Sequence, residues 1–111
     1  MIEYQLLISN QFVEDRDRIY RYISFVLLAP TSAIKLIDEI YEKIEALKVF
    51  PNRNPMYIEQ HLSNRFIRKT AVDDYCVVYA VDDEKRLVEC LRIVHQTQEK
   101  DYSLHDVVDD E

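Results

Sequence analysis

The chain has 111 residues, of which 48% are hydrophobic and 32% charged, and its formal net charge is −7. These values describe one globular domain with a modest core, and no apolar run is long enough to span a bilayer. The N-terminus has no basic stretch followed by an apolar one, so we expect no signal peptide and a cytoplasmic location. Because the chain contains no glycine, a glycine-rich phosphate-binding loop is excluded.

The negative charge is concentrated at the C-terminus. Residues 99–111 carry six carboxylates against one lysine, whereas residues 1–98 carry 13 Lys/Arg and 15 Asp/Glu. We therefore expect a single domain over residues 1–98, followed by a flexible acidic tail over residues 99–111. The nearly neutral body argues against strong non-specific binding of nucleic acids.

The first half of the chain predicts a strand and two helices. Residues 2–8 alternate between apolar and polar, as a strand does, and Ser9 or Asn10 can cap a helix over 11–28. Pro30 ends that helix, and Thr31 or Ser32 can cap a second one over 32–48. The short link makes the two helices an antiparallel hairpin. Their apolar stripes predict core packing by Phe12, Ile19, Ile23, Val26 and Leu27 in the first helix, and by Ala33, Ile37, Ile40, Ile44 and Leu47 in the second.

The second half predicts three strands joined by acidic turns. Residues 56–63 fit either a loop or a short strand, and strands follow over 65–72, 75–81 and 86–95. The segment 75–81 is apolar at nearly every position, which is typical of a central strand covered on both faces. Cys76 and Cys90 occupy apolar strand positions and are interpreted as buried free thiols. Without Cys or His at ligand spacing, neither a metal nor a cofactor is expected.

This order of elements predicts an α+β fold. A strand, a helical hairpin and a three-strand antiparallel meander form a two-layer domain, with the hairpin on one face of the sheet. Nothing in the sequence is an obvious cover for the opposite face, so we expect that face to be solvated or filled by a partner.

Several stretches of the sequence resemble the RelE/ParE toxin family of bacterial type II toxin–antitoxin modules, the plasmid stabilisation proteins. The resemblance extends from about Tyr4 to Tyr102, and its strength lies in the order and spacing of the motifs. The family usually has basic residues after the closing histidine, whereas residues 96–100 here are nearly neutral. The motifs are Asp17-Arg-Ile-Tyr-Arg-Tyr-Ile23, Pro30-Thr-Ser-Ala33, Ile44-Glu-Ala-Leu-Lys-Val-Phe-Pro51, Arg68 seven residues before the Tyr75–Val81 strand, and Leu91-Arg-Ile-Val-His95.

The resemblance implies growth inhibition and a cognate antitoxin protein as partner. RelE-like members cleave mRNA on the ribosome, whereas ParE-like members poison DNA gyrase without chemistry of their own. Because the set of candidate catalytic groups is weak, we favour ParE-like action on DNA gyrase. The alternatives are a RelE-like ribosome-dependent endoribonuclease, which alone would make the protein an enzyme, and an inactive relative that only binds its antitoxin. A toxin–antitoxin hetero-oligomer is possible, and no membrane partner is expected.

The candidate site residues are cations of the two outer meander strands and the closing histidine. Arg65, Arg68, Lys69 and Arg92 are the candidate partner-binding residues, and Arg68, Arg92 and His95 would be catalytic only in an RNA-cleaving toxin. We expect the side chains of Arg68 and Arg92 to meet on a common sheet face. The alternative is that both arginines pair with carboxylates or extend along a sheet edge, and that His95 caps a strand end. Tyr75 and Tyr79 are more simply core aromatics.

Overall fold

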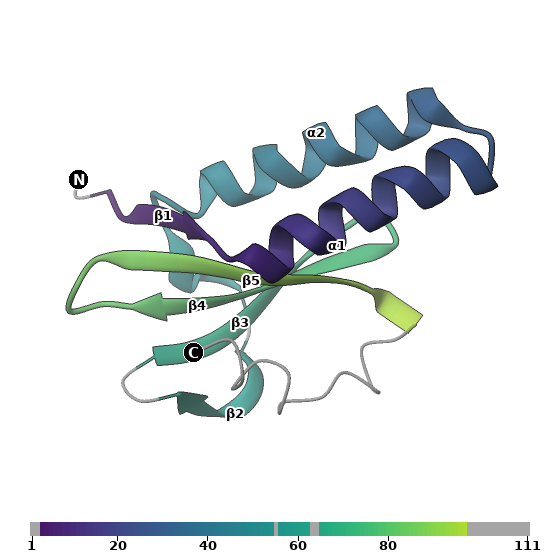
Figure 1. Cartoon of the computed structure of the whole chain (residues 1–111). Coiled ribbons are helices and arrows are strands. Elements are labelled where there is room, and N and C mark those ends of the chain that lie inside the picture. Colours follow the sequence, from purple (N-terminus) through teal and green to yellow (C-terminus); the bar gives the residue numbers. More distant parts are fainter. Residues whose placement is uncertain (1–2, 55, 63–64, 98–111) are drawn as a thin grey trace.

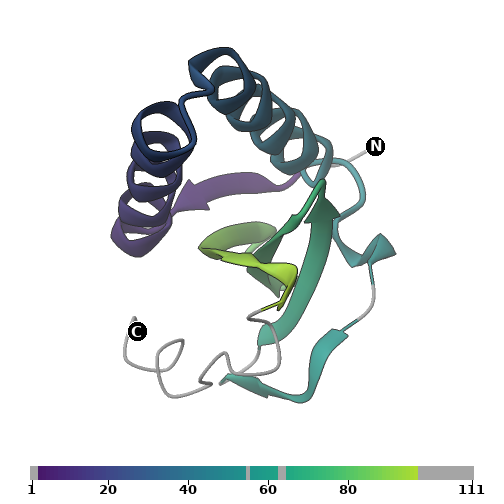
Figure 2. The same ribbon diagram turned by 90° about the vertical axis from the view of Figure 1, so that its right-hand side faces the viewer.

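The computed structural model describes residues 3–54, 56–62 and 65–97, with residues 56–62, 65 and 66 described by their backbone alone. The predicted tail, 99–111, therefore lies outside the described residues. The elements are β1 (Gln5–Ile8), α1 (Asn10–Arg21), a π-helical turn η1 (Tyr22–Val26), α2 (Pro30–Ala46), a 3₁₀ turn η2 (Pro51–Arg53), β2 (Met56–Leu62), β3 (Arg65–Val72), β4 (Tyr75–Asp82) and β5 (Leu87–His95). Two helices lie over one face of a twisted sheet, so the predicted two-layer α+β architecture is confirmed (Figure 1, Figure 2).

The sheet has five strands in the order β1-β5-β4-β3-β2. β1 runs parallel to β5, and the other neighbours are antiparallel. β2 shows that the ambiguous stretch before the meander is a strand. In the absence of glycine, Asp73 takes the left-handed backbone conformation in the β3–β4 turn, with φ of 56°, which aspartate tolerates better than most residues.

The two helices begin in different ways. Ser9 caps α1 as predicted, because its Oγ accepts a hydrogen bond from the Phe12 N–H at 3.1 Å. The predicted start of the second helix was wrong: α2 begins at Pro30, and the residue before it makes no side-chain cap. Proline suits the first helical position because the missing N–H has no partner there anyway. Within the described ranges, no helix combines the length and apolar character needed to cross a bilayer.

The main core lies between the helices and the sheet. Ile40 and Ile44 of α2 are fully buried against the face of β4 that carries Val77 and Tyr79, which confirms the predicted packing. Leu36 is also buried there, although the predicted stripe passed through Ile37. Both cysteines are buried thiols that form no disulfide with each other, as predicted.

The opposite face of the sheet is also buried. Its apolar side chains are at most 8% exposed: Ile67, Cys76, Val78, Ala80, Leu91 and Val94. The expectation that this face is solvated or waits for a partner was therefore wrong for these residues.

The π-helical turn ends the first helix and changes which residues face the core. In η1 the Leu27 N–H bonds to the Tyr22 carbonyl at 3.0 Å, a five-residue step that rotates later residues away from the α-helical stripe. Val26 and Leu27, which the stripe assigned to the core, are consequently exposed. Within the described part of the chain, the buried Ser24 hydroxyl has no hydrogen-bond partner.

Candidate functional site

Arg92 is held by a buried carboxylate on α1. Asp15 is only 1% exposed, and its two oxygens accept hydrogen bonds from Arg92 Nε at 2.8 Å and Arg92 Nη2 at 3.1 Å. The same carboxylate accepts from Arg18 Nη2 at 2.8 Å and from the Ile93 N–H at 2.9 Å. A bidentate pair of this kind is strong and directional, so Arg92 fastens the first helix to the last strand.

The position of Asp15 follows from the sheet topology. β1 pairs with β5 only as far as Cys90, so the Ile93 N–H lies beyond the end of the edge strand. A buried backbone N–H without an acceptor is costly, and the Asp15 side chain supplies that acceptor. Arg92 thus pairs with a carboxylate, which was the alternative expectation for this residue.

Arg68 is held by a different part of the chain. Its Nε donates to Asn52 Oδ1 at 3.1 Å and its Nη1 to the Asn54 carbonyl at 2.6 Å. The Asn54 amide in turn donates to the Tyr79 hydroxyl, which donates to the Pro51 carbonyl at 2.7 Å. Burial raises the pKa of Tyr79, so its hydroxyl stays protonated. These hydrogen bonds attach the loop around η2 to strands β3 and β4 of the sheet.

The two arginines do not meet, because they bind different parts of the chain. Arg68 is bonded to Asn52 and Asn54 of the loop around η2, whereas Arg92 is bonded to Asp15 of α1. Lys69 is half-buried, and of Arg65 only the backbone is described, as the first residue of β3.

His95 is the last residue of β5. Its Nδ1 accepts a hydrogen bond from the Thr97 N–H at 3.2 Å and lies 2.8 Å from the Thr97 hydroxyl, which assigns the proton of the neutral ring to Nε2. The ring meets Tyr75 edge-on, with centroids 5.1 Å apart. Burial, assisted by the charge of Asp74, raises the pKa of Tyr75. Tyr75 is therefore a poor general base near neutral pH.

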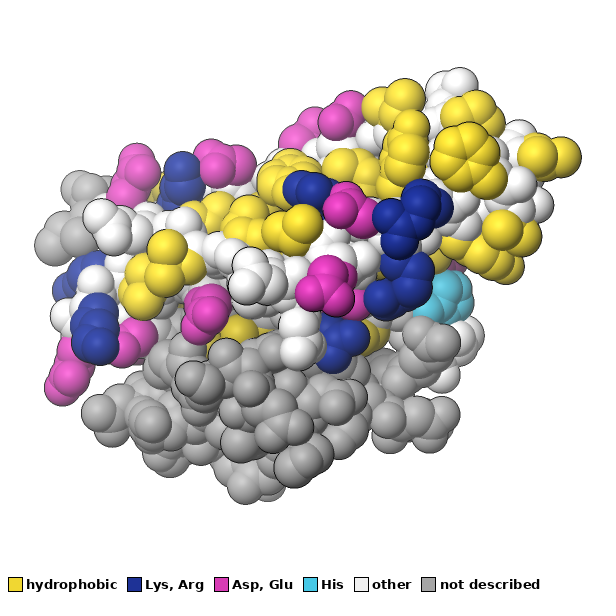
Figure 3. Space-filling model, in the orientation of Figure 1, with side chains coloured by type: hydrophobic (Ala, Val, Ile, Leu, Met, Phe, Trp, Pro, Cys, Tyr) yellow, Lys and Arg dark blue, Asp and Glu magenta, His cyan; other side chains and the backbone are white. Residues whose placement is uncertain are grey.

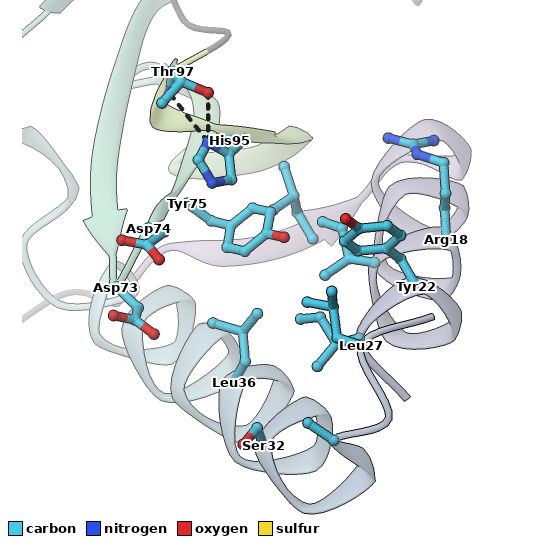
Figure 4. A pocket seen from close by; sticks show the side chains of 14 residues that line it. Arg18, Tyr22, Leu27, Ser32, Leu36, Asp73, Asp74, Tyr75, His95 and Thr97 are labelled. Carbon is cyan, nitrogen blue, oxygen red and sulfur yellow. Dashed lines mark hydrogen bonds between the residues drawn. The ribbon is translucent and has the colours of Figure 1, made fainter. Parts of the chain in front are cut away.

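A pocket of about 770 Å³ opens beside His95, between the hairpin and the end of the sheet. Figure 4 shows Asp73 and Asp74 on one side of the pocket and Arg18 on the other, with the rings of Tyr75 and Tyr22 between them. The remaining wall is largely apolar: Ile19, Ile23, Leu27, Ala29, Leu36 and Ile93. Among the described residues, no three His, Cys, Asp or Glu side chains are grouped as metal ligands. A pocket of this composition suits apolar side chains of another protein segment better than a metal or a nucleotide.

The free end of the helical hairpin carries a second notable surface. Figure 3 shows apolar side chains gathered over this end and bordered by lysine and arginine side chains. We call this surface the hairpin-tip patch. It consists of six side chains that are 49% to 80% exposed: Tyr22, Phe25, Val26, Leu27, Leu28 and Ile34. This surface was not predicted from the sequence, although the side chains of four consecutive apolar residues, 25–28, cannot all face the core from one helix.

Taken with the fold, these features define a protein of the RelE/ParE-like toxin class: a helical hairpin packed on an antiparallel meander, with surfaces suited to binding other proteins. The family described as "ParE toxin of type II toxin-antitoxin system, parDE" matches residues 6–100. The chain therefore belongs to the ParE toxin family and is the toxin component of a type II toxin–antitoxin module, as the resemblance implied.

Solved structures show the same fold at low sequence identity. A chain of the chromosomal ParDE system from P. aeruginosa superimposes with a TM-score of 0.66 and 20% identity, over 84% of this chain and 96% of that one. A chain of the archaeal RelE–RelB complex from Pyrococcus horikoshii gives 0.60 and 15%, over 86% and 97%. A chain of the RelBE2 complex from Mycobacterium tuberculosis gives 0.55 and 19%, over 86% and 93%. The comparison with curated proteins found no match.

Proposed function

We propose that this toxin inhibits DNA gyrase by binding it, without bond-breaking chemistry of its own. The observation that carries the proposal is the separation of the candidate catalytic groups. Arg68 is bonded to the loop around η2, Arg92 to α1 and His95 to Thr97. RNA cleavage needs a base, an acid and cations around one phosphate, whereas a binding inhibitor needs only a complementary surface. Membership of the ParE family supports gyrase as the target, and gyrase inhibition implies a cytoplasmic location.

Two assays distinguish gyrase inhibition from ribosome-dependent cleavage. The purified toxin is added to gyrase with relaxed plasmid and ATP, and separately to translating ribosomes with a labelled mRNA. We expect loss of supercoiling or accumulation of cleaved plasmid, and intact mRNA. Cut mRNA together with unimpaired gyrase would refute the proposal. Toxin mixed with its antitoxin is the matched control in both assays.

We also propose that a cognate antitoxin binds this chain. Family membership supports this partner, and the exposed hairpin-tip patch offers apolar surface to a segment that folds on binding. The neighbouring gene should encode a small protein with an ordered DNA-binding end and a disordered tail. Co-expression followed by purification through a tag on that protein should recover both chains. Recovery of the tagged protein alone would contradict the assignment.

Arg65, Arg68, Lys69 and Arg92 remain the proposed partner-binding residues. Growth inhibition by Arg68→Ala and Lys69→Ala proteins, with circular dichroism to verify folding, tests the β3 cations. For Arg92 the matched control is Asp15→Ala, because it breaks the same ion pair from the other side. If Arg92 contacts the target directly, Arg92→Ala should lose more toxicity than Asp15→Ala at equal stability. Equal losses would make Arg92 a structural residue.

A further inference from the structure

The direction of the Arg68 guanidinium depends on two hydrogen bonds to the loop around η2. Its Nε donates to Asn52 Oδ1 at 3.1 Å and its Nη1 to the Asn54 carbonyl at 2.6 Å. A guanidinium carries five N–H donors, and these bonds use two of them. Arg68 is only half-buried, so its guanidinium can bind a carboxylate or phosphate of a partner while the loop fixes its direction.

One of these two acceptors is a side-chain amide, which can point either way. The Asn54 acceptor belongs to the backbone, whereas the Asn52 amide has an oxygen that accepts and an NH2 group that donates. Rotating this amide by half a turn would set its NH2 group against the Arg68 guanidinium, and neither group could accept from the other. A third group must therefore decide which way the Asn52 amide points.

The Asp83 carboxylate in the β4–β5 turn is that third group. Asn52 Nδ2 donates to Asp83 Oδ1 at 3.1 Å. Because an ionised carboxylate accepts hydrogen bonds but cannot donate them, it binds the NH2 end of the amide and leaves the amide oxygen facing Arg68. The Tyr4 hydroxyl donates to the same carboxylate oxygen at 2.6 Å. This hydrogen bond lowers the pKa of Asp83, so the carboxylate is ionised at neutral pH.

The turn that carries Asp83 is itself held by Tyr4 and Arg86. Tyr4 is buried, and its hydroxyl accepts a hydrogen bond from Arg86 Nη1 at 3.2 Å. The Arg86 guanidinium carbon lies 5.5 Å from the centre of the Tyr4 ring, within the range of a cation–π contact. The Arg86 carbonyl accepts from the Gln5 N–H at 2.8 Å, which fastens the turn to β1. These contacts fix the position of Asp83 relative to the sheet.

We propose that Asp83 is a positioning residue for Arg68. Through the Asn52 amide, Asp83 keeps the Arg68 guanidinium in the direction in which it meets an acceptor on the toxin's target. This inference rests on the proposed role of Arg68 in partner binding. The series of hydrogen bonds joins β1, the β4–β5 turn, the loop around η2 and β3 through Tyr4, Asp83, Asn52 and Arg68.

The exchange of the Arg68 Nε–H proton with water, measured by NMR on the full-length toxin, tests the positioning directly. Asp83→Ala should make this exchange about fivefold faster, because the Asn52 amide is no longer held. Asp83→Asn should keep the wild-type rate, since an amide oxygen at this position still accepts from Asn52. Glu84→Ala is the matched control, because Glu84 is an exposed carboxylate of the same turn, and it should leave the rate unchanged. Equal rates in Asp83→Ala and the wild type would overturn the proposal.

A double-mutant cycle in the gyrase supercoiling assay separates positioning from a general structural role. Arg68→Ala and Asp83→Ala should each raise the toxin concentration that gives half-inhibition, Asp83→Ala by about fivefold. If Asp83 acts through Arg68, adding Asp83→Ala to Arg68→Ala should cause no further loss. Circular dichroism verifies that each variant is folded.

Two results of this cycle would overturn the proposal. Additive losses would show that Asp83 acts independently of Arg68, and unchanged inhibition by folded Asp83→Ala would show that its contact with Asn52 has no effect on the target. A wild-type toxin that leaves gyrase unimpaired would instead refute the proposed target, and the proton-exchange measurement would then decide by itself whether Asp83 positions Arg68.

Discussion

Replacing Asp15 with alanine is the most informative single change in this fold. The Asp15 carboxylate is almost completely buried and accepts four hydrogen bonds, three from guanidinium groups and one from the Ile93 N–H. Its removal leaves Arg92, whose side chain is 18% exposed, charged without this partner. It also leaves the Ile93 N–H without this acceptor.

The expected cost can be worked from these contacts. Breaking a buried ion pair from one side costs about 3–5 kcal/mol, and an unsatisfied backbone N–H costs about 1–3 kcal/mol when counted alone. Because the two effects share one carboxylate, we expect about 3–5 kcal/mol in total. With a urea m-value of about 2 kcal/mol per M, the unfolding midpoint should fall by roughly 1.5–2.5 M.

Urea unfolding followed by circular dichroism measures this loss. The matched control is Asp17→Ala, since Asp17 pairs with Arg16 at 2.9 Å on the surface, where such pairs contribute at most about 1 kcal/mol. The double variant Asp15→Leu with Arg92→Met should recover much of the loss, because no buried charge remains. A loss below about 1 kcal/mol in Asp15→Ala would refute the reasoning that this carboxylate joins α1 to β5.

Three further predictions concern the core, the pH dependence and the thiols. Ile40→Ala should cost about 2–5 kcal/mol in urea unfolding because Ile40 is fully buried, whereas Ile34→Ala, at the exposed tip, should cost less than about 1 kcal/mol; equal losses would contradict the packing. The hydrogen bond from Tyr4 lowers the pKa of Asp83 below its usual 3.8, so its stabilising effect is present above pH 3.8 and is lost as the pH falls through the lower folded-state pKa. Tyr4→Phe should make the stability below about pH 4 less pH-dependent. If melting at several pH values shows the same loss of stability below about pH 4 in the variant as in the wild type, the result would count against this contact. Burial raises the pKa of Cys90 to about 12, so a thiol reagent at pH 8 should label it only on unfolding; rapid labelling of the native protein would show that the strand is accessible.

The order of the elements followed from local patterns in the sequence. Alternation in 2–8, the apolar stripes of the helices and the acidic turns of the meander depend on residues a few positions apart. Their interpretation as strand, hairpin and meander is confirmed. The burial of Cys76 and Cys90 was predicted in the same way, because both occupy apolar positions of predicted strands.

The candidate site was harder to predict because its decisive contacts join distant residues. Asp15 and Arg92 are 77 positions apart, and nothing in the sequence around Asp15 distinguishes it from the other carboxylates of α1. The expected meeting of Arg68 with Arg92 failed for a similar reason. Arg68 is bonded to Asn54, 14 positions away, and Arg92 to Asp15, so contacts between distant residues decide where each guanidinium lies.

Periodicity and short, ordered motifs were enough to predict the fold class, the central strand and the family. The buried charges, the partner of each arginine and the location of the apolar surface could not be predicted in this way, because they depend on contacts between distant residues. The π-helical turn illustrates the difference. A change of hydrogen-bond step at Tyr22–Val26 moved Val26 and Leu27, which were predicted as core residues, into the exposed hairpin-tip patch, and such a change reflects packing around the whole helix end.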